Sequence, residues 1–228
     1  MAVLEVVDLK KGFVSPDGER TRIVDVPRFV MNEAEQIALQ GSSGSGKTTF
    51  LNLIAGILQP DSGSISISGQ ELASLSEAGR DRIRAQSIGY VFQTFNLLQG
   101  YTALENVLLG MMFGRGADPV YAKALLERVG LKDRMNYRPR QLSVGQQQRV
   151  AVARALANHP KLVLADEPTG NLDYQHAGAA LELIREVCRE QNAALLLVTH
   201  DRDILNRFDH VQNLADINKA IAPPVVEP

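Results

Sequence analysis

A glycine-rich segment between two apolar stretches constrains the fold of this chain more than any other feature. It has the sequence Gly-Ser-Ser-Gly-Ser-Gly-Lys-Thr at residues 41–48 and follows a short apolar run at residues 37–39. After it, apolar residues recur at helical spacing over residues 50–57, so the predicted order is strand, loop and helix. In this context the backbone N–H groups of the loop can curl around phosphate oxygens, and the helix N-terminus adds partial positive charge. The segment therefore predicts a phosphate-binding loop in an α/β chain.

Two side chains of this loop have distinct chemistry. Lys47 can reach the β- and γ-phosphates of a nucleoside triphosphate, and Thr48 offers a hydroxyl to Mg²⁺. A glycine- and serine-rich turn without a ligand is the alternative, but the flanking strand and helix favour the phosphate site. The motif alone indicates a nucleoside triphosphate and nothing narrower. The residues expected around its phosphates are Gly41, Ser42, Ser43, Gly44, Ser45, Gly46, Lys47, Thr48 and Thr49.

Two acidic residues follow a second apolar run. Residues 162–165 are continuously apolar, as in parallel strands that are buried on both faces, and Asp166 and Glu167 come next. If this strand lies near the strand before the loop, its acids reach the sheet edge where ligands bind. We expect Asp166 to hold Mg²⁺ and Glu167 to act as the general base that polarises the attacking water, a role worth about 10²–10⁴-fold in rate. Without the phosphate loop, an ordinary acidic turn would be the simpler interpretation.

The rest of the chain predicts a P-loop NTPase core with two additions. Strand-like segments at residues 3–9 and 23–30 flank a polar stretch and indicate an N-terminal antiparallel hairpin. Helical patterns without a convincing strand fill residues 102–158, whereas strands and helices alternate afterwards, as in a parallel sheet. We therefore expect one α/β domain over residues 1–228. Its parts would be a core of residues 1–93 and 160–221, an inserted helical subdomain of about 94–159, and a mobile tail of 222–228.

Composition disfavours several classes of protein. The net charge is −2, without the basic excess of domains that grip nucleic acid, so we expect no nucleic-acid partner. The one cysteine, Cys188, excludes a disulfide within the chain and fits a reducing compartment. The most apolar stretches, residues 107–114 and 193–198, are much shorter than the ~20 residues of a membrane helix, and the start does not resemble a secretory signal. We expect a cytoplasmic protein that would need a partner to act at a membrane.

Four further segments resemble motifs of the ABC ATPases. Residues 142–146, Leu-Ser-Val-Gly-Gln, resemble the signature sequence of that family, and Gln93 resembles its Q-loop glutamine. Residues 171–173, Asn-Leu-Asp, resemble the D-loop, and His200 resembles the switch histidine. All occur in the order of the family, and the resemblance spans residues 3–201. It implies an ATPase that uses ATP and Mg²⁺ and dimerises head to tail, with each ATP between the phosphate loop of one copy and the signature of the other.

The resemblance also implies roles for individual residues. Ser143, Gly145 and Gln146 would contact the ATP bound to the partner copy, at the start of a helix that stabilises negative charge. Asp173 would shape the dimer interface. Gln93, His200 and Lys47 would complete the catalytic group around Glu167, with Gln93 on Mg²⁺ or the attacking water and His200 on the γ-phosphate.

Two positions leave alternatives open. Val144 stands where family members commonly have glycine; a positive φ would cost a β-branched residue at least about 1–2 kcal/mol, whereas a negative φ would accommodate it. Because Ser143 and Gly145 are kept, we expect activity to be retained. Family members stack an aromatic residue on the adenine, and Phe13 is the candidate; the alternative is that Phe13 belongs to the hairpin core.

One branch of the family is especially similar in residues 102–107 and 165–173. That branch powers lipoprotein release, macrolide-type efflux and related envelope processes. Its membrane partners are permeases with few transmembrane helices and large external domains. The resemblance implies a peripheral position on the cytoplasmic face of the inner membrane, bound to such a permease. Residues 95–102 resemble the surface where ABC ATPases receive the coupling helix of their membrane partner. Transmission of a signal to envelope enzymes without transport is the alternative, and a two-domain soluble ABC protein of translation or repair is disfavoured.

Overall fold

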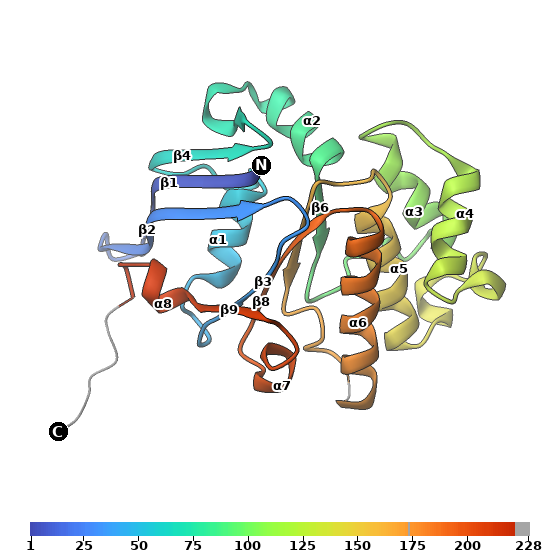
Figure 1. Ribbon diagram of the computed structural model, residues 1–228. Coiled ribbons are helices and arrows are strands. Elements are labelled where there is room, and N and C mark those ends of the chain that lie inside the picture. Colours follow the sequence, from blue (N-terminus) through green and yellow to red (C-terminus); the bar gives the residue numbers. More distant parts are fainter. Residues whose placement is uncertain (173, 222–228) are drawn as a thin grey trace.

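The computed structural model describes residues 1–172 and 174–221 and contains two β-sheets flanked by helices (Figure 1). One sheet is antiparallel with the strand order β2-β1-β4-β5, and the other is parallel with the order β6-β7-β8-β3-β9. The predicted α/β class with an antiparallel N-terminal part is confirmed. The strands are β1 Ala2–Val14, β2 Arg20–Asn32, β3 Gln36–Gln40, β4 Ser62–Ile67, β5 Gln70–Glu71, β6 Ile88–Val91, β7 Leu162–Asp166, β8 Ala194–Thr199 and β9 His210–Asn213.

The helices fall into two groups. α1 follows the phosphate loop and packs between the two sheets, whereas α3, α4 and α5 gather at the side of the molecule away from β1 and β2 (Figure 1). This second group occupies the region predicted as a helical insertion. The helices are α1 Lys47–Ile54, α2 Glu77–Ser87, α3 Ala103–Met112, α4 Pro119–Arg128, α5 Val144–Leu156, α6 Tyr174–Glu190, α7 Arg202–Leu205 and α8 Leu214–Ile217. Short 3₁₀ helices lie at Leu72–Ser74, Lys132–Arg134 and Pro139–Gln141.

The N-terminal hairpin is confirmed, but its strands are longer than predicted. Both strands continue into the stretch that was expected to be a turn. The carboxylate of Asp61, which follows α1, pairs with this stretch. Asp61 accepts from the Lys11 ammonium at 3.1 Å, from the Arg20 guanidinium at 2.7 Å and from the Gly12 backbone N–H at 2.8 Å. These contacts lower the pKa of Asp61 to about 2, with the Gly12 hydrogen bond as the largest cause. A polar composition therefore concealed a continued β-ladder, which has a register shift between Lys11 and Gly12.

The parallel sheet is buried on both faces, as the continuous apolar runs predicted. Along β7, Leu162 and Leu164 face the core that contains α1 and the antiparallel sheet. Val163 and Ala165 face the opposite core, which contains the helices α3 to α6. Because successive side chains of a strand alternate between faces, one short strand serves two cores. The carboxyl end of β7 is thereby fixed at the sheet edge next to the phosphate loop.

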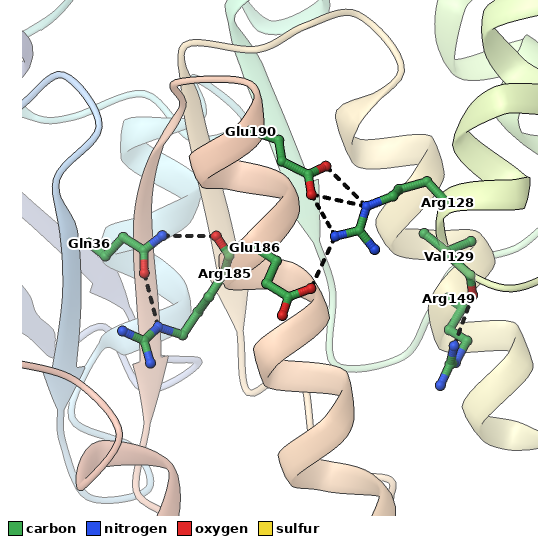
Figure 2. A network of polar contacts seen from close by, with 7 residues as sticks. All are labelled: Gln36, Arg128, Val129, Arg149, Arg185, Glu186 and Glu190. Atoms are coloured by element: carbon green, nitrogen blue, oxygen red, sulfur yellow. Dashed lines mark hydrogen bonds and ion pairs between the residues drawn. The ribbon is translucent and has the colours of Figure 1, made fainter.

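A polar network connects α6 to α4 on one side and to β3 on the other (Figure 2). Arg128 at the end of α4 pairs with Glu186 at 3.0 Å and with Glu190 at 2.6 Å on α6. Arg185 on the same helix donates to the side chain of Gln36 on β3 at 2.9 Å. Exposed ion pairs contribute little individually, so the network chiefly orients the helical group relative to the sheet.

Burial settles two smaller points. Cys188 is fully buried, and burial raises the pKa of its thiol to about 12, so it behaves as a small apolar residue. Met111 packs in the helical core, whereas Met112 is 64% exposed. Over residues 1–172 and 174–221, none of the helices has the length and apolar character to cross a bilayer.

Candidate functional site

The phosphate loop connects β3 to α1. β3 ends at Gln40 and α1 begins at Lys47, so the loop lies at the carboxyl edge of the parallel sheet. Gly46 precedes the helix with φ of +89°, and a Cβ there would lie 3.0 Å from the carbonyl oxygen of Ile23. Glycine is required at this position on both counts. The loop also buries the Ser45 hydroxyl, for which the described residues offer no hydrogen-bond partner.

Lys47 is folded back into the loop. Its side chain is buried, and its ammonium donates to the carbonyl oxygens of Gly41 at 2.8 Å and Ser42 at 2.9 Å. The same nitrogen lies 3.3 Å from Oε1 of Glu167. The ammonium is therefore already at the loop, where it faces the carboxylate that follows β7.

Glu167 is held from several sides in a sharp turn. Its φ is +45°, a left-handed conformation that costs an ordinary residue about 1–2 kcal/mol. The Thr199 hydroxyl donates to its Oε2 at 3.0 Å, and Nδ1 of His200 lies 2.7 Å from its Oε1. Together with Lys47, these contacts point the buried carboxylate toward the loop. Backbone strain that the surroundings maintain in this way is typical of functional sites.

Asp166 fits a magnesium ligand. Its side chain is buried, and its Oδ1 has no hydrogen-bond partner among the residues that the structure describes. Burial raises the pKa of this carboxyl above its usual value, against the opposing effect of a hydrogen bond from Thr48. Mg²⁺ is commonly held by one or two carboxylates together with substrate phosphates. The described part of the chain contains no trio of His, Cys, Asp or Glu that could hold a metal alone, so phosphate oxygens would complete such a site.

The buried carboxylate of Asp166 leads to a prediction for the nucleotide-free protein. Asp166→Asn should raise its free energy of unfolding by about 1 kcal/mol, because it removes a desolvated charge. The advantage over wild type should be largest above the raised pKa and should shrink as the pH falls through it, because protonation then relieves the wild-type carboxylate. Denaturant unfolding of both proteins at pH values between about 4 and 8 measures this difference in stability. A variant less stable than wild type throughout would contradict the prediction.

One cavity of about 490 Å³ collects residues that were predicted from separate parts of the sequence. They are Phe13, Lys47, Thr48, Gln93, Glu167 and His200. Ser43, Gly44, Gly46 and Thr49 of the loop also line it. Gly41 and Ser42 line a neighbouring cavity that shares His200. The structure thus brings these residues together around the loop.

Phe13 lies at the open end of this cavity. It is 43% exposed, so the alternative that it belongs to the hairpin core is wrong. The ammonium of Lys11 lies 5.7 Å from its ring centre, within the range of a cation–π contact. Ile23 of β2 lines the cavity as well, a position that no sequence motif indicated. An aromatic and an aliphatic surface therefore adjoin the polar loop.

Gln93 is in contact with the segment after β7. The amide of Asn171 donates to the Gln93 backbone oxygen at 2.6 Å, and a Cβ on Gly170 would lie 3.3 Å from the Gln93 side-chain nitrogen. The Q-loop-like and D-loop-like segments of this chain thus touch each other. Asp173, predicted to shape a dimer interface, lies outside the described residues.

The signature-like residues form a helix N-terminus and do not line the cavity. Ser143 caps α5 by accepting from the Gln146 backbone at 3.3 Å, while the Gln146 side chain accepts from the Ser143 backbone at 3.0 Å. Val144 is the first residue of the helix, so its φ is negative and valine fits there. Its side chain is 48% exposed. A Cβ on Gly145 would meet nothing within 4 Å among the described residues. This end of α5 is open to solvent and to another molecule.

Comparisons with known proteins agree with this geometry. The family model described as ABC transporter matches residues 24–170. The lipoprotein-releasing system ATP-binding protein LolD of Pseudomonas syringae pv. tomato is 42% identical over 216 residues, 93% of this chain and 95% of the relative. LolD 1 of Caulobacter vibrioides is 44% identical over 218 residues, 94% of this chain and 93% of the relative.

Solved structures give the same result. A dimeric post-hydrolysis state of the ATP-binding cassette MJ0796, bound to ADP and Pi, has a TM-score of 0.84 and 34% identity, and covers 92% of this chain and 94% of its own. A second dimeric structure of MJ0796, described as a bacterial ABC transporter cassette, has the same TM-score at 35% identity, and the same shares of the two chains are covered. The chain therefore belongs to the ABC transporter family and is an ATP-binding ATPase of that family.

Proposed function

We propose that two copies of this chain hydrolyse ATP as a head-to-tail dimer and thereby drive a separate membrane permease. The observation that carries the dimer is that Ser143 and Gly145 do not line the cavity that contains Lys47 and Glu167. A capped helix N-terminus with open space around Gly145 would bind the γ-phosphate of ATP held by the other copy. The structures of MJ0796, which are dimeric, support a dimer of this chain.

The predicted site residues have distinct roles in this proposal. Lys47 and the loop backbone bind the β- and γ-phosphates, Thr48 and Asp166 hold Mg²⁺, and Phe13 stacks on the adenine. When bound, Mg²⁺ neutralises charge on the phosphates. His200 hydrogen-bonds the γ-phosphate, and Asp173 of the D-loop contributes to the interface. The assignment of Asp166 is supported by its unpartnered buried oxygen.

Glu167 is the general base in this proposal. Its carboxylate is now shared between the Lys47 ammonium, at 3.3 Å, and the Thr199 hydroxyl, at 3.0 Å. In this proposal an incoming γ-phosphate competes both for Lys47 and for His200, whose Nδ1 lies 2.7 Å from Oε1 of Glu167. Their loss frees Oε1 to accept a proton from the attacking water. Gln93 positions that water or contacts Mg²⁺. The nucleotide-free contacts thus keep the base paired until the triphosphate arrives.

The permease would bind a groove between α2, α3 and α5. The groove has a volume of about 510 Å³ and is lined by the stacked rings of Tyr90 and Phe92, 4.0 Å apart, and by Phe113. Phe113 is 73% exposed, a large apolar side chain without cover. Exposed apolar surface of this kind marks interaction sites. Because the LolD relatives are named as parts of a lipoprotein-releasing system, we propose a permease of that class at the cytoplasmic face of the membrane.

Purification from membranes tests this proposal. The wild-type chain should retain a transmembrane protein of few helices and a large external domain, whereas Phe113→Asp should lose it because a charge would replace the exposed aromatic ring of the groove. ATP hydrolysis by the isolated Phe113→Asp protein should stay within about twofold of wild type. The matched control is Val120→Asp on α4, where valine is 80% exposed and outside the groove lining. Equal recovery of the membrane protein with Phe113→Asp and wild type would contradict this docking site.

A further inference from the structure

Gln148 joins the signature-like helix to the turn that carries the proposed base. It is the fifth residue of α5, and its side chain is 1% exposed. Its amide nitrogen donates to the backbone oxygen of Pro168, the residue directly after Glu167. One side chain therefore connects the helix that begins at Ser143 to the segment that follows β7.

The turn after β7 depends on such a contact. Glu167 has a positive φ, a conformation that persists only when the surroundings enforce it. Backbone hydrogen bonds hold the turn on either side: Glu167 N–H donates to Val198 at 3.0 Å, and Gly170 N–H donates to Glu167 at 3.0 Å. Between these two anchors the peptide of Pro168 lacks an N–H, so its carbonyl oxygen is the polar group by which it can be held. Gln148 supplies that hydrogen bond.

The cost of placing an amide here also points to a positioning role. Val150 and Ala151, which follow two and three residues later in α5, are buried and apolar, and an apolar side chain would suit position 148 equally well. Instead, Gln148 buries its Oε1 without a hydrogen-bond partner among the described residues. A buried oxygen without a hydrogen bond is unfavourable, so the amide at this position has a cost. The amide nitrogen, which does have a hydrogen bond, is the atom that holds Pro168.

We propose that Gln148 is a positioning residue, which sets the direction of the Glu167 carboxylate through the Pro168 carbonyl and couples it to the position of α5. This rests on the assignment of Glu167 as the base. Under the proposed dimer, Ser143 at the start of α5 contacts the ATP of the partner copy, while Glu167 acts on the ATP of its own copy. Gln148 then links the two composite sites within one chain, so that α5 must be in its ATP-contacting position before the base is aligned.

The test is Gln148→Met, which keeps the length of the side chain but removes the donor. The turnover number should fall about tenfold, while the Kd for ATP changes less than twofold and the melting temperature stays high enough for assay. In the Glu167→Gln background, adding Gln148→Met should lower the residual rate no further, because both changes act on the same step. Gln148→Ala replaces the methionine variant if that variant does not fold.

Gln191 provides a matched control. Its amide donates to the Tyr121 hydroxyl of α4 at 2.8 Å, and its Oε1 is also buried without a partner within the described chain, but it does not line the cavity. Gln191→Met should keep the wild-type turnover number. Wild-type turnover in a folded Gln148 variant, or a loss matched by Gln191→Met, would overturn the inference and leave the base assignment standing. Full hydrolysis by Glu167→Gln alone would overturn the base assignment itself.

Discussion

Replacing Glu167 with glutamine is expected to lower the rate of ATP hydrolysis by about 10²–10⁴-fold while ATP binding persists. Glutamine has the size of glutamate and can still accept the hydrogen bond that the Thr199 hydroxyl now donates at 3.0 Å. It cannot take the proton of the attacking water. Because ATP is bound and not consumed, the two copies should remain closed around it. Steady-state hydrolysis, ATP binding and sedimentation of the Glu167→Gln protein with and without ATP measure these three expectations.

A second substitution shows whether the trapped dimer depends on the signature-like residues. Ser143→Asp and Ser143→Asn both keep a side chain that caps a helix, so α5 should stay intact in either. In the Glu167→Gln background, the charged Ser143→Asp should abolish the ATP-dependent dimer, because a carboxylate would face the γ-phosphate of the other copy. The neutral Ser143→Asn should largely keep it. A dimer that survives both changes would place the interface elsewhere on the protein.

Local sequence patterns were sufficient to predict the phosphate loop and the acidic residues at the end of β7. The predicted glycine-rich loop does lie between β3 and α1, and Gly46 adopts the left-handed conformation there. The run at residues 162–165 is buried on both faces and presents Asp166 and Glu167 at the sheet edge. In both cases the information lies within a few consecutive residues, because period-two burial and backbone conformation are local properties.

Elements defined by distant partners could not be predicted in this way. All residues of β9, His210–Asn213, are exposed, so the strand has no apolar alternation and exists through its pairing with β3. The same holds for Ile23, which lines the cavity because β2 passes the phosphate loop. The contact of Gln148 with Pro168 likewise depends on how α5 packs against β7. Such contacts follow from tertiary packing, and a single segment of the sequence does not carry the information to predict them.

Lys47→Ala should weaken ATP binding by about 100-fold and remove measurable hydrolysis, since truncating one partner of a buried charged contact costs about 2–5 kcal/mol. The structure adds that the nucleotide-free protein should also lose stability. Lys47 donates to Gly41 and Ser42 and lies 3.3 Å from Glu167, so its loss leaves a buried carboxylate without its nearest ammonium. We expect the free energy of unfolding to fall by about 2 kcal/mol.

The double variant Lys47→Ala with Glu167→Gln separates these two effects of Lys47. Neutralising Glu167 removes the unpaired charge, so the double variant should recover most of the stability that Lys47→Ala loses. It should not recover ATP binding, because the ammonium that attracts the β- and γ-phosphates is still missing. Denaturant unfolding and ATP titration of the four proteins complete the cycle. If Glu167→Gln restored ATP affinity to the Lys47→Ala protein, the weak binding would come from the unpaired carboxylate of Glu167, and Lys47 would not be the phosphate ligand.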